Sequence, residues 1–589
     1  MLSRIFIYPA EIILFIYLIC FLFLKTSDNP WERAIDSDGK GYYAYLPAIF
    51  IYHDLKYNFV ESYEKKYYPE DGSRFKDFRY KYKGETVNKT FSGLAILWLP
   101  FFLIAHLLSY IFGFETDGYS VIYQYSIAIA AIFYLWLGCK ILLGVLKRFA
   151  NQSVSSFIVL CFAFGTNLFY FTINVPSFAH VYNFSLIASF IYCIIVTIET
   201  KKRKWFILSA VVYTLIVAVR PPNGIIILIV PFLVKDWQGL KLFILENVLV
   251  VKKILPALFL GTIILFIPVT LWYLQTGYFL VYSYGEESFD FSKPEITNNL
   301  FSYRKGLFVY TPLAFISLFG LIPVLRKRKF QFLALGLFLI FIIYVISSWW
   351  CWWYGASFGQ RAYIDYFPIF AIVLGFLLTY ASTNKFFKIF LFTCCILTIP
   401  LNLIQSYQHK KGIVPDDNVT QEIYWDNFLR MKPRPKVYID ENTFLKKNEL
   451  IQDMEGCNSK TDSISFEGKS SSFINSKTEF SCGIEKSISE FTTDNASLIK
   501  ISAEIFPLGS STKARLVVQI DSAGIVYDYN AFGFNEYAEE NRWTHVQFSC
   551  NIPRPKSEND FIKIYLWNSG KEDVVYIDNL KAEFYEKKK

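Results

Sequence analysis

The chain has 589 residues, of which 53% are apolar and 19% aromatic, and its formal net charge is +9. So much apolar surface exceeds what the core of one soluble domain can bury, and we expect lipid to cover much of it. The positive charge does not indicate nucleic-acid binding, because the basic residues gather in short runs between apolar spans. Composition therefore predicts a polytopic membrane protein rather than a soluble one.

A helix needs roughly 20 mostly apolar residues to cross the hydrocarbon core of a bilayer. Candidate spans cover residues 5–24, 92–112, 120–146, 154–172, 178–198, 205–219, 223–234, 254–275, 306–325, 330–348, 365–381 and 386–406. The first is expected to be a retained anchor, because its apolar stretch is too long for a signal peptide and lacks a small-residue exit. We predict about 11 to 13 spans within residues 1–435.

Two basic runs set the expected orientation of these spans. Lys201–Lys204 and Arg326–Lys329 are typical of cytoplasmic loops. This places the loop 276–305, the Trp-rich stretch 349–361 and the C-terminal tail outside the cytoplasm. Counted back through four spans from Lys201, the long polar segment 26–90 would lie inside.

The last part of the chain has a different apolar pattern. Apolar residues alternate in Ile499-Ile501-Ala503-Ile505, Leu516-Val518-Ile520, Val546-Phe548-Cys550 and Ile562-Ile564-Leu566. Short alternating strands separated by turn residues predict an antiparallel, jelly-roll-like β-sandwich over residues 440–589. Its three cysteines, Cys457, Cys482 and Cys550, allow one disulfide, and the sequence does not give the pairing.

The first candidate for chemistry follows the first span. Asp36, Asp38 and Lys40 lie together in a glycine-containing stretch that ends in an aromatic, interfacial segment, residues 36–47. A carboxylate there suits a general base for an acceptor hydroxyl, or a ligand of a divalent cation that faces a phosphate. The alternative is a solvated turn capped by an Asp side chain.

The second candidate is the Trp-rich stretch. Trp353, Tyr354, Gln360 and Arg361 lie within it, and Asp365 follows. Aromatic faces stack on the C–H faces of sugars, and a guanidinium binds phosphate through two parallel hydrogen bonds. The alternative is an interfacial aromatic belt with an arginine that reaches toward water.

Three isolated groups accompany these clusters at the expected outer ends of spans. They are His180, Arg220 and Lys305. The cations suit a lipid phosphate, although basic residues also anchor helices without a ligand, and a lone histidine is more often structural. The sequence contains no Walker A, GxGxxG, HExxH or CxxC motif, so we predict no nucleotide-driven pump, Rossmann cofactor or zinc site.

The arrangement of these residues resembles membrane glycosyltransferases of the GT-C superfamily, of the protein mannosyltransferase and aminoarabinose transferase type, and in particular uncharacterised members from Bacteroidetes-like bacteria. The resemblance covers residues 1 to about 430. It rests on Asp38 to Pro47 with Tyr52 to Leu55, on Gly165 to Tyr170, on Pro176-Ser177 with His180 to Tyr182, and on Trp352 to Gly355 with Gly359 to Arg361.

The resemblance implies a GT-C fold, a polyprenyl-phosphate-linked sugar donor, and a glycan, lipid or protein acceptor outside the cytoplasm. It also implies a catalytic carboxylate in the first outer loop, which matches Asp38 first and Asp36 second. We find no match for a second acidic catalytic residue in the early spans, which leaves a role for a divalent cation open. The tail is similar to carbohydrate-binding modules.

The resemblance further implies a bacterial inner-membrane protein whose C-terminal domain lies in the periplasm, and it places the segment 26–90 outside. One of the first spans is then expected not to cross. The stretch 92–112, interrupted by Pro100, is our candidate for a re-entrant or interfacial element. The alternative is that the orientation derived from the basic runs is wrong.

Two other functions are compatible with a polytopic, aromatic-rich chain. A transporter of lipid-linked sugars typically has internal repeats and charges buried in the middle of the membrane, and the sequence shows neither. A polysaccharide ligase or polymerase uses the same lipid donors, but its usual long outer loop comes late in the chain, whereas the long loop here comes first.

Overall fold

The computed structural model describes residues 8–25, 34–68, 77–432, 437, 439, 443–487, 496–509, 512–522, 524–535, 537–553, 555–557 and 559–588. The chain divides into two compact units. The first consists of Met1–Lys410 and Val414–Tyr424, and the second of Lys411–Ile413 and Trp425–Lys589. Within the boundary expected between residues 435 and 440, only residues 437 and 439 are described.

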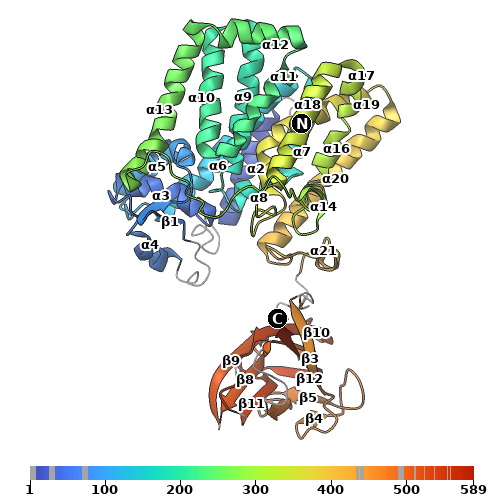
Figure 1. The fold of residues 1–589 in the computed structure, drawn as a ribbon. Coiled ribbons are helices and arrows are strands. Elements are labelled where there is room, and N and C mark those ends of the chain that lie inside the picture. The colour runs from blue at the N-terminus through green and yellow to red at the C-terminus, as the bar shows by residue number, and fades with distance from the viewer. Residues whose placement is uncertain are drawn as a thin grey trace. The chain divides into compact units, whose positions relative to one another are not determined.

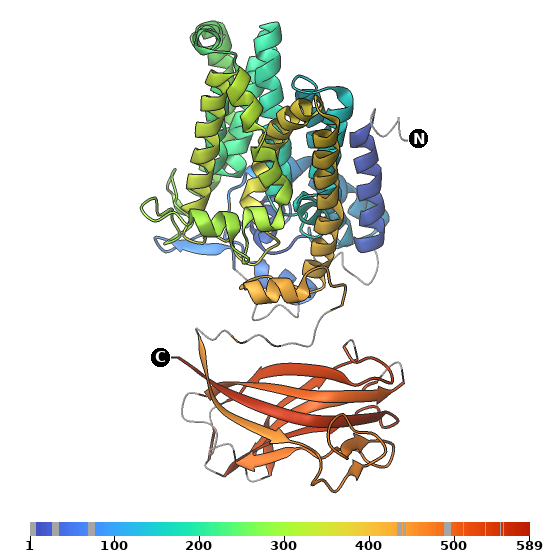
Figure 2. The same ribbon diagram turned by 90° about the vertical axis from the view of Figure 1, so that its right-hand side faces the viewer.

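The first unit is built from helices and one small hairpin. The long helices run side by side (Figure 1, Figure 2). In chain order the elements are α2 (Pro9–Lys25), α3 (Asp38–Phe50), α4 (Val60–Tyr67), β1 (Arg79–Tyr82), β2 (Glu85–Asn88), α5 (Gly93–Phe112), α6 (Val121–Leu146), α7 (Gln152–Phe164), α8 (Leu168–Ile173), α9 (His180–Thr200), α10 (Arg203–Val219), η3 (Pro221–Ile229), α11 (Val230–Leu233), α12 (Trp237–Phe243), η4 (Ile244–Val248), α13 (Val251–Thr276), α14 (Ile296–Phe301), α15 (Leu307–Tyr310), α16 (Pro312–Leu318), α17 (Leu321–Lys327), α18 (Lys329–Ser347), η5 (Arg361–Tyr366), α19 (Phe367–Ala381), α20 (Lys385–Lys410) and α21 (Gln421–Asn427), the last of which extends past the unit boundary.

Seven helices in the described part of the chain are long and apolar enough to cross a membrane. They confirm the predicted helical membrane region. Other predicted spans are shorter or broken. The span expected at 223–234 is the 3-10 helix η3 followed by one turn of α11, and it begins with Pro221-Pro222. The span expected at 306–325 is split into α15, α16 and α17, because Pro312 starts a new helix and Gly320 packs against the Val373 backbone.

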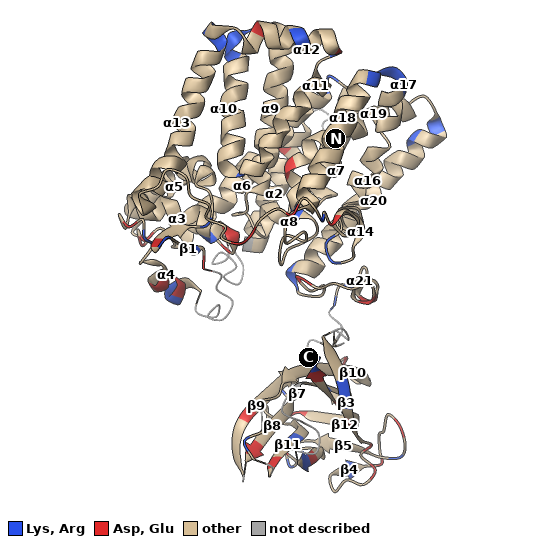
Figure 3. Ribbon diagram, in the orientation of Figure 1, with Lys and Arg blue, Asp and Glu red and all other residues tan. Residues whose placement is uncertain are grey.

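The two ends of this unit differ in charge. Lysine and arginine gather at the end where α12 and α17 lie, whereas α3, α4, β1 and α14 lie at the opposite end (Figure 3). Lys201 pairs with Glu246 across the basic end at 2.8 Å. At the other end, which we call the site end, the amide of Gln275 donates to the hydroxyl of Tyr57 at 2.9 Å. Runs of lysine and arginine are typical of the cytoplasmic ends of membrane helices.

Helix α5 begins and ends at the site end. At its start, a Cβ on Gly93 would lie 2.2 Å from the Ala218 carbonyl carbon, where α10 ends. Just after it, the Gly118 carbonyl accepts a hydrogen bond from the Tyr43 hydroxyl of α3 at 2.6 Å. The residues at the start of the stretch expected at 92–112 and those just after its end therefore both contact groups at the site end, although its length and composition would let it cross a membrane. The described residues of the segment 26–90, which are 34–68 and 77–90, lie at the same end as 276–305 and 349–361 (Figure 1).

The second unit is a sandwich of two antiparallel sheets. Its strands are β3 (Phe444–Gln452), β4 (Lys460–Thr461), β5 (Ser471–Ile474), β6 (Ile484–Ser487), β7 (Ala496–Leu508), β8 (Arg515–Ser522), β9 (Ile525–Gly533), β10 (Thr544–Asn551), β11 (Asp560–Trp567) and β12 (Val574–Lys587). One sheet has the order β10-β7-β12-β5-β4, with β3 also on β12, and the other has the order β6-β11-β8-β9. The predicted all-β fold is confirmed.

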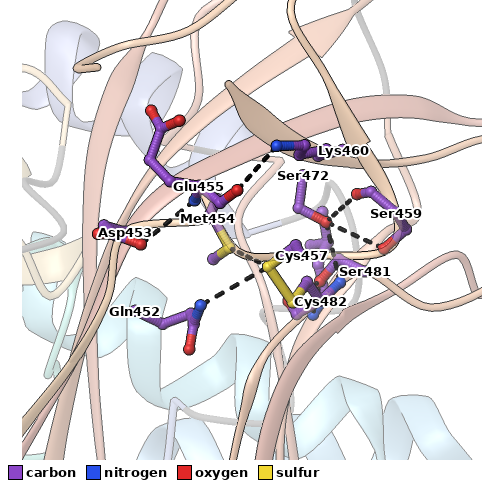
Figure 4. The surroundings of a disulfide bond; sticks show 11 residues. Gln452, Asp453, Met454, Glu455, Cys457, Ser459, Lys460, Ser472, Ser481 and Cys482 are labelled. Atoms are coloured by element: carbon purple, nitrogen blue, oxygen red, sulfur yellow. Dashed lines mark hydrogen bonds between the residues drawn. A yellow bond between two sulfur atoms is a disulfide. The ribbon is translucent and has the colours of Figure 1, made fainter. Parts of the chain in front are cut away.

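The sandwich core consists of alternate residues of the predicted strands. Ile501 of β7, Val518 of β8 and Ile564 of β11 are all buried in one cluster. Cys457 and Cys482 form a disulfide, which is the pairing that the sequence did not give. Figure 4 shows the polar groups around it. Cys550 is a free thiol, and burial raises its pKa to about 12. This thiol therefore stays protonated and unreactive at neutral pH.

Candidate functional site

The site begins where α3 begins, at Asp38. The chain enters α3 through a tight turn in which Gly39 N–H donates to the Asp36 carbonyl at 2.9 Å. The Asp36 carboxylate accepts from the Ser37 N–H at 2.7 Å and so shapes this turn. Asp38 is the first residue of the helix, and 42% of its side chain is exposed. Of the two predicted carboxylates, the first turn of α3 therefore presents Asp38 to a ligand.

A close approach between α3 and the segment before α9 fixes this turn. A Cβ on Gly39 would lie 2.0 Å from the Ser177 hydroxyl oxygen, so only glycine fits there. The same hydroxyl accepts from the Asp36 N–H at 3.2 Å. The stretch predicted as a loose glycine turn is thus a helix whose first turn packs tightly. Its glycines provide room for a neighbour rather than flexibility.

Arg361 is the partner of Asp38. It stands at the start of η5, and its Nη2 lies 2.8 Å from the Asp38 carboxylate. Its guanidinium also lies over the Phe178 ring, 4.7 Å from the ring centroid. Among the described residues, its buried Nε has no hydrogen-bond partner. The structure thus brings together the strongest candidates of two sequence clusters more than 300 residues apart.

A second carboxylate lies nearby at Asp365, and its side chain is fully buried. Three groups surround it. Arg220 Nη1 lies 2.8 Å from Oδ2, Asn223 donates its amide to the same oxygen at 2.6 Å, and His180 Nδ1 lies 2.8 Å from Oδ1. A buried charge is tolerated only when it is paired and hydrogen-bonded in this way. His180 and Arg220 are therefore joined to each other through this carboxylate.

Two tyrosines lie between these charged groups. Burial, and to a smaller extent the Asp38 charge, raise the pKa of the Tyr42 hydroxyl to about 12, whereas Arg220 and Arg361 oppose the shift. Burial likewise raises the pKa of Tyr354. Tyr354 has a φ of 56°, an unusual backbone conformation for a bulky residue. Both hydroxyl groups stay protonated at neutral pH, and that of Tyr354 donates to the Ile346 carbonyl at 3.3 Å.

The other predicted site residues contact different partners. Lys40 is buried and pairs with Glu64 at 3.0 Å, and its ammonium lies 3.7 Å from the Tyr68 ring centroid. Lys305 is also buried, and it donates to the carbonyls of Ser357 and Asp416. Both cations support the loops around the site in this structure.

Gln360 and Trp353 hold the Trp-rich stretch in place. The Gln360 side chain is fully buried and donates to the Trp352 carbonyl at 2.8 Å. The Trp353 ring lies 3.6 Å from the guanidinium carbon of Arg304. That guanidinium in turn forms a bidentate pair with Asp417, at 2.7 and 3.0 Å. These contacts fix the loop that positions Arg361.

Sequence reasoning missed Asp365 and Asn223 as members of the site. Asp365 appeared only as the residue that follows the Trp-rich stretch, and Asn223 was not among the candidates. The available signal was an acidic residue at the start of a strongly apolar span, which is rarely placed there without a partner. Its partners come from two other helices, so their identity needed the fold. In the described ranges, no group of three His, Cys, Asp or Glu side chains is placed to hold a metal ion.

The sequence matches no family model and no curated protein. Three solved structures are similar in parts. ArnT from Cupriavidus metallidurans bound to undecaprenyl phosphate is 13% identical over 72% of this chain and 75% of its own, with a TM-score of 0.38. The arabinosyltransferase EmbB from Mycobacterium smegmatis is 8% identical over 78% of this chain and 57% of its own, with a TM-score of 0.30. The CBM22-1 xylan-binding domain of Xyn10C from Paenibacillus barcinonensis is 16% identical over 24% of this chain and 86% of its own, with a TM-score of 0.17. These scores are too low to carry an argument about fold or function, which therefore rests on the residues of the site.

Proposed function

We propose that this chain is a membrane glycosyltransferase that moves a sugar from a polyprenyl-phosphate-linked donor to an acceptor outside the cytoplasm. The observation that carries the proposal is the pairing of Asp38 with Arg361 at 2.8 Å, at the end opposite the basic loops. A half-exposed carboxylate beside a guanidinium provides a base and a phosphate ligand within one ion pair. The acceptor is a glycan, a lipid or a protein.

The chemistry follows from an exchange of partners. The phosphate of the donor takes over the Arg361 guanidinium, which binds phosphate oxygens as readily as carboxylate oxygens. Asp38 is then released to accept the proton of the acceptor hydroxyl as that oxygen attacks the anomeric carbon. The new bond joins the acceptor oxygen to this carbon. The bond from the carbon to the phosphate oxygen breaks, and its electron pair stays on the polyprenyl phosphate, which the guanidinium stabilises.

The location of the site supports a bacterial inner-membrane protein that works on the periplasmic face. The site end carries the described residues 34–68 and 77–90 and the segments 276–305 and 349–361, and α20 ends there at Lys410 (Figure 1). The Cys457–Cys482 disulfide suits an oxidising compartment such as the periplasm. We therefore place the C-terminal sandwich in the periplasm.

We further propose that the C-terminal sandwich binds a glycan on the outer face of its larger sheet. Phe506, Tyr576 and Phe473 are aligned across β7, β12 and β5, with ring centroids 6.1 and 6.4 Å apart. Their sequence neighbours, such as Ile505 and Ile577, point into the core, so these rings point outward. A row of aromatic rings offers flat faces to the C–H faces of sugars.

The test is transfer of radiolabelled sugar from a pool of lipid-linked donors by the purified full chain in liposomes. Asp38→Asn and Arg361→Ala are expected to abolish transfer. The chain offers a matched control, because Asp77 pairs with Arg79 at 2.7 Å in the same outer segment. Asp77→Asn and Arg79→Ala should leave transfer unchanged. No transfer by the wild type from any polyprenyl-phosphate sugar would refute the proposal and favour a ligase or a transporter.

A further inference from the structure

Arg361 and Arg220 lie close together. Arg361 and Asp365, the carboxylate that pairs with Arg220, both belong to the short helix η5. The Arg361 guanidinium lies over the Phe178 ring, whose centroid is 6.4 Å from that of the His180 ring, and His180 Nδ1 lies 3.2 Å from Arg220 Nη1. Each guanidinium pairs with a carboxylate at 2.8 Å.

The two carboxylates differ in exposure. The Asp38 side chain is 42% exposed, so water or a ligand can replace its contact with Arg361. The Asp365 side chain is fully buried and is also held by Asn223 and His180. This contact cannot be exchanged without opening the fold. Arg220 is therefore fixed on one edge, through Nη1, while 18% of its side chain remains exposed.

His180 is oriented by the same carboxylate. His180 Nδ1 lies 2.8 Å from Asp365 Oδ1 and 3.2 Å from Arg220 Nη1. An ionised carboxylate only accepts hydrogen bonds, so the shorter contact places the proton on Nδ1. In the neutral ring, Nε2 then has the lone pair. Asp365 thus sets both the direction of the Arg220 guanidinium and the tautomer of His180.

We propose that Asp365 is a positioning residue, which holds Arg220 as the second guanidinium of a two-arginine site for the phosphate of the lipid-linked donor. This inference rests on the proposed function. A buried ion pair contributes little to stability compared with well-packed apolar residues. A fully buried carboxylate at this place is better explained by the group that it orients. Because Asp365 already balances the charge of Arg220, the second guanidinium adds hydrogen-bond donors without adding net charge.

The two arginines then have different tasks. Arg361 exchanges Asp38 for the phosphate, whereas Arg220 keeps Asp365 and approaches the phosphate with its exposed edge. The site remains neutral before the donor enters. Loss of Arg220 or of its orientation should weaken donor binding, while the proton transfer to Asp38 is affected less.

The test compares Asp365→Asn, Arg220→Gln and the double variant, which replaces the buried ion pair by two neutral amides. Thermal unfolding reports on the fold, binding of polyprenyl phosphate to the full chain in nanodiscs reports on the site, and donor KM and kcat separate binding from chemistry. Uncharged polyprenol is the control ligand. The matched control pair is Arg148 with Glu199, at 3.0 Å near the basic end, replaced by Gln in both positions.

We expect each single variant to be destabilised and the double variant to regain most of the wild-type melting temperature. The double variant should nevertheless bind polyprenyl phosphate at least tenfold more weakly, with a similar rise in donor KM, a smaller change in kcat and unchanged binding of polyprenol. Wild-type binding by the double variant would show that the pair only supports the fold and would overturn the inference. Should the double variant fail to fold, Arg220→Lys keeps the charge but changes the geometry, and it should weaken binding at least threefold; wild-type affinity there would equally overturn the inference.

These outcomes are separable from those for the proposed function. If the wild type transfers sugar and the double variant binds normally, the inference about Asp365 fails while the proposed function holds. If the wild type neither binds polyprenyl phosphate nor transfers sugar, both fail.

Discussion

Replacing Asp38 by Asn is expected to separate donor binding from catalysis. In the proposed mechanism the Asp38 carboxylate competes with the donor phosphate for Arg361. The substitution keeps the size of the side chain but removes both the negative charge and the base. We therefore expect the variant to bind the donor more tightly while it turns over far more slowly.

The magnitude follows from the exposure of the pair. Asp38 is 42% exposed and Arg361 14%, so solvent screens their attraction. Such pairs contribute about 0.2 to 1 kcal/mol, which corresponds to an increase in donor affinity of at most about fivefold. Removal of a general base typically lowers the rate by about 100-fold to 10,000-fold. The two effects have opposite signs, which distinguishes them from a loss of folded protein.

The assay measures the Kd of polyprenyl phosphate and the rate of sugar transfer on the same reconstituted samples, with Asp77→Asn as the control. Retention of more than a tenth of the wild-type rate would show that Asp38 is not the base. Weaker binding of the donor would show that Asp38 contacts the phosphate or a cation on it, and the exchange of partners at Arg361 would then be wrong.

Three further predictions follow from individual side chains. Gly39→Ala should lower the free energy of unfolding by about 1 to 3 kcal/mol and reduce transfer, because the new Cβ would lie 2.0 Å from the Ser177 hydroxyl oxygen. Gly336→Ala is the control, since a Cβ there has open space and should leave thermal unfolding unchanged. Equal effects of the two substitutions would contradict this reasoning. Burial lowers the pKa of Lys305 to about 8, whereas the ordinary value is near 10.4. Between these two pH values the unfolded chain binds more protons than the folded one, so the free energy of unfolding should rise with pH. Lys305→Met should flatten this rise in unfolding measured against pH, and an unchanged slope would refute the assignment. Tyr576→Ala in β12 should weaken binding of the full chain to immobilised glycans at least tenfold. Tyr529→Ala in β9, on the other sheet, should leave this binding unchanged. The reverse result would place the glycan site on the sheet that contains β9.

The sequence predicted those parts of the molecule that repeat. The period-two pattern at Ile562, Ile564 and Leu566 identified β11, because one face of a strand must be apolar. The long apolar stretches identified the membrane helices for a similar reason. The break at Gly320 was not predicted, since it depends on the approach of the Val373 backbone to this glycine.

The sequence named candidate residues one by one, but it did not predict which of them contact one another. Asp38 and Arg361 were both candidates, and only the fold shows that they form an ion pair. Lys305 was expected to face a phosphate, yet it donates to two backbone carbonyls, because its loop closes over it. Asp365 was overlooked, because its partners Arg220 and His180 are distant in sequence. Long-range pairing of polar groups leaves no periodic signal.

The path of α5 has a consequence for how the chain enters the membrane. Its 20 residues have a mean hydropathy of 2.1 over the best window, as high as that of α6, so an insertion apparatus that reads one segment at a time would treat it as a span. In the folded protein it also contacts α3 and the end of α10, and α10 is made roughly a hundred residues later. If these contacts hold α5 on one side of the membrane, the side on which Asp38 lies is set only after α10 has been synthesised.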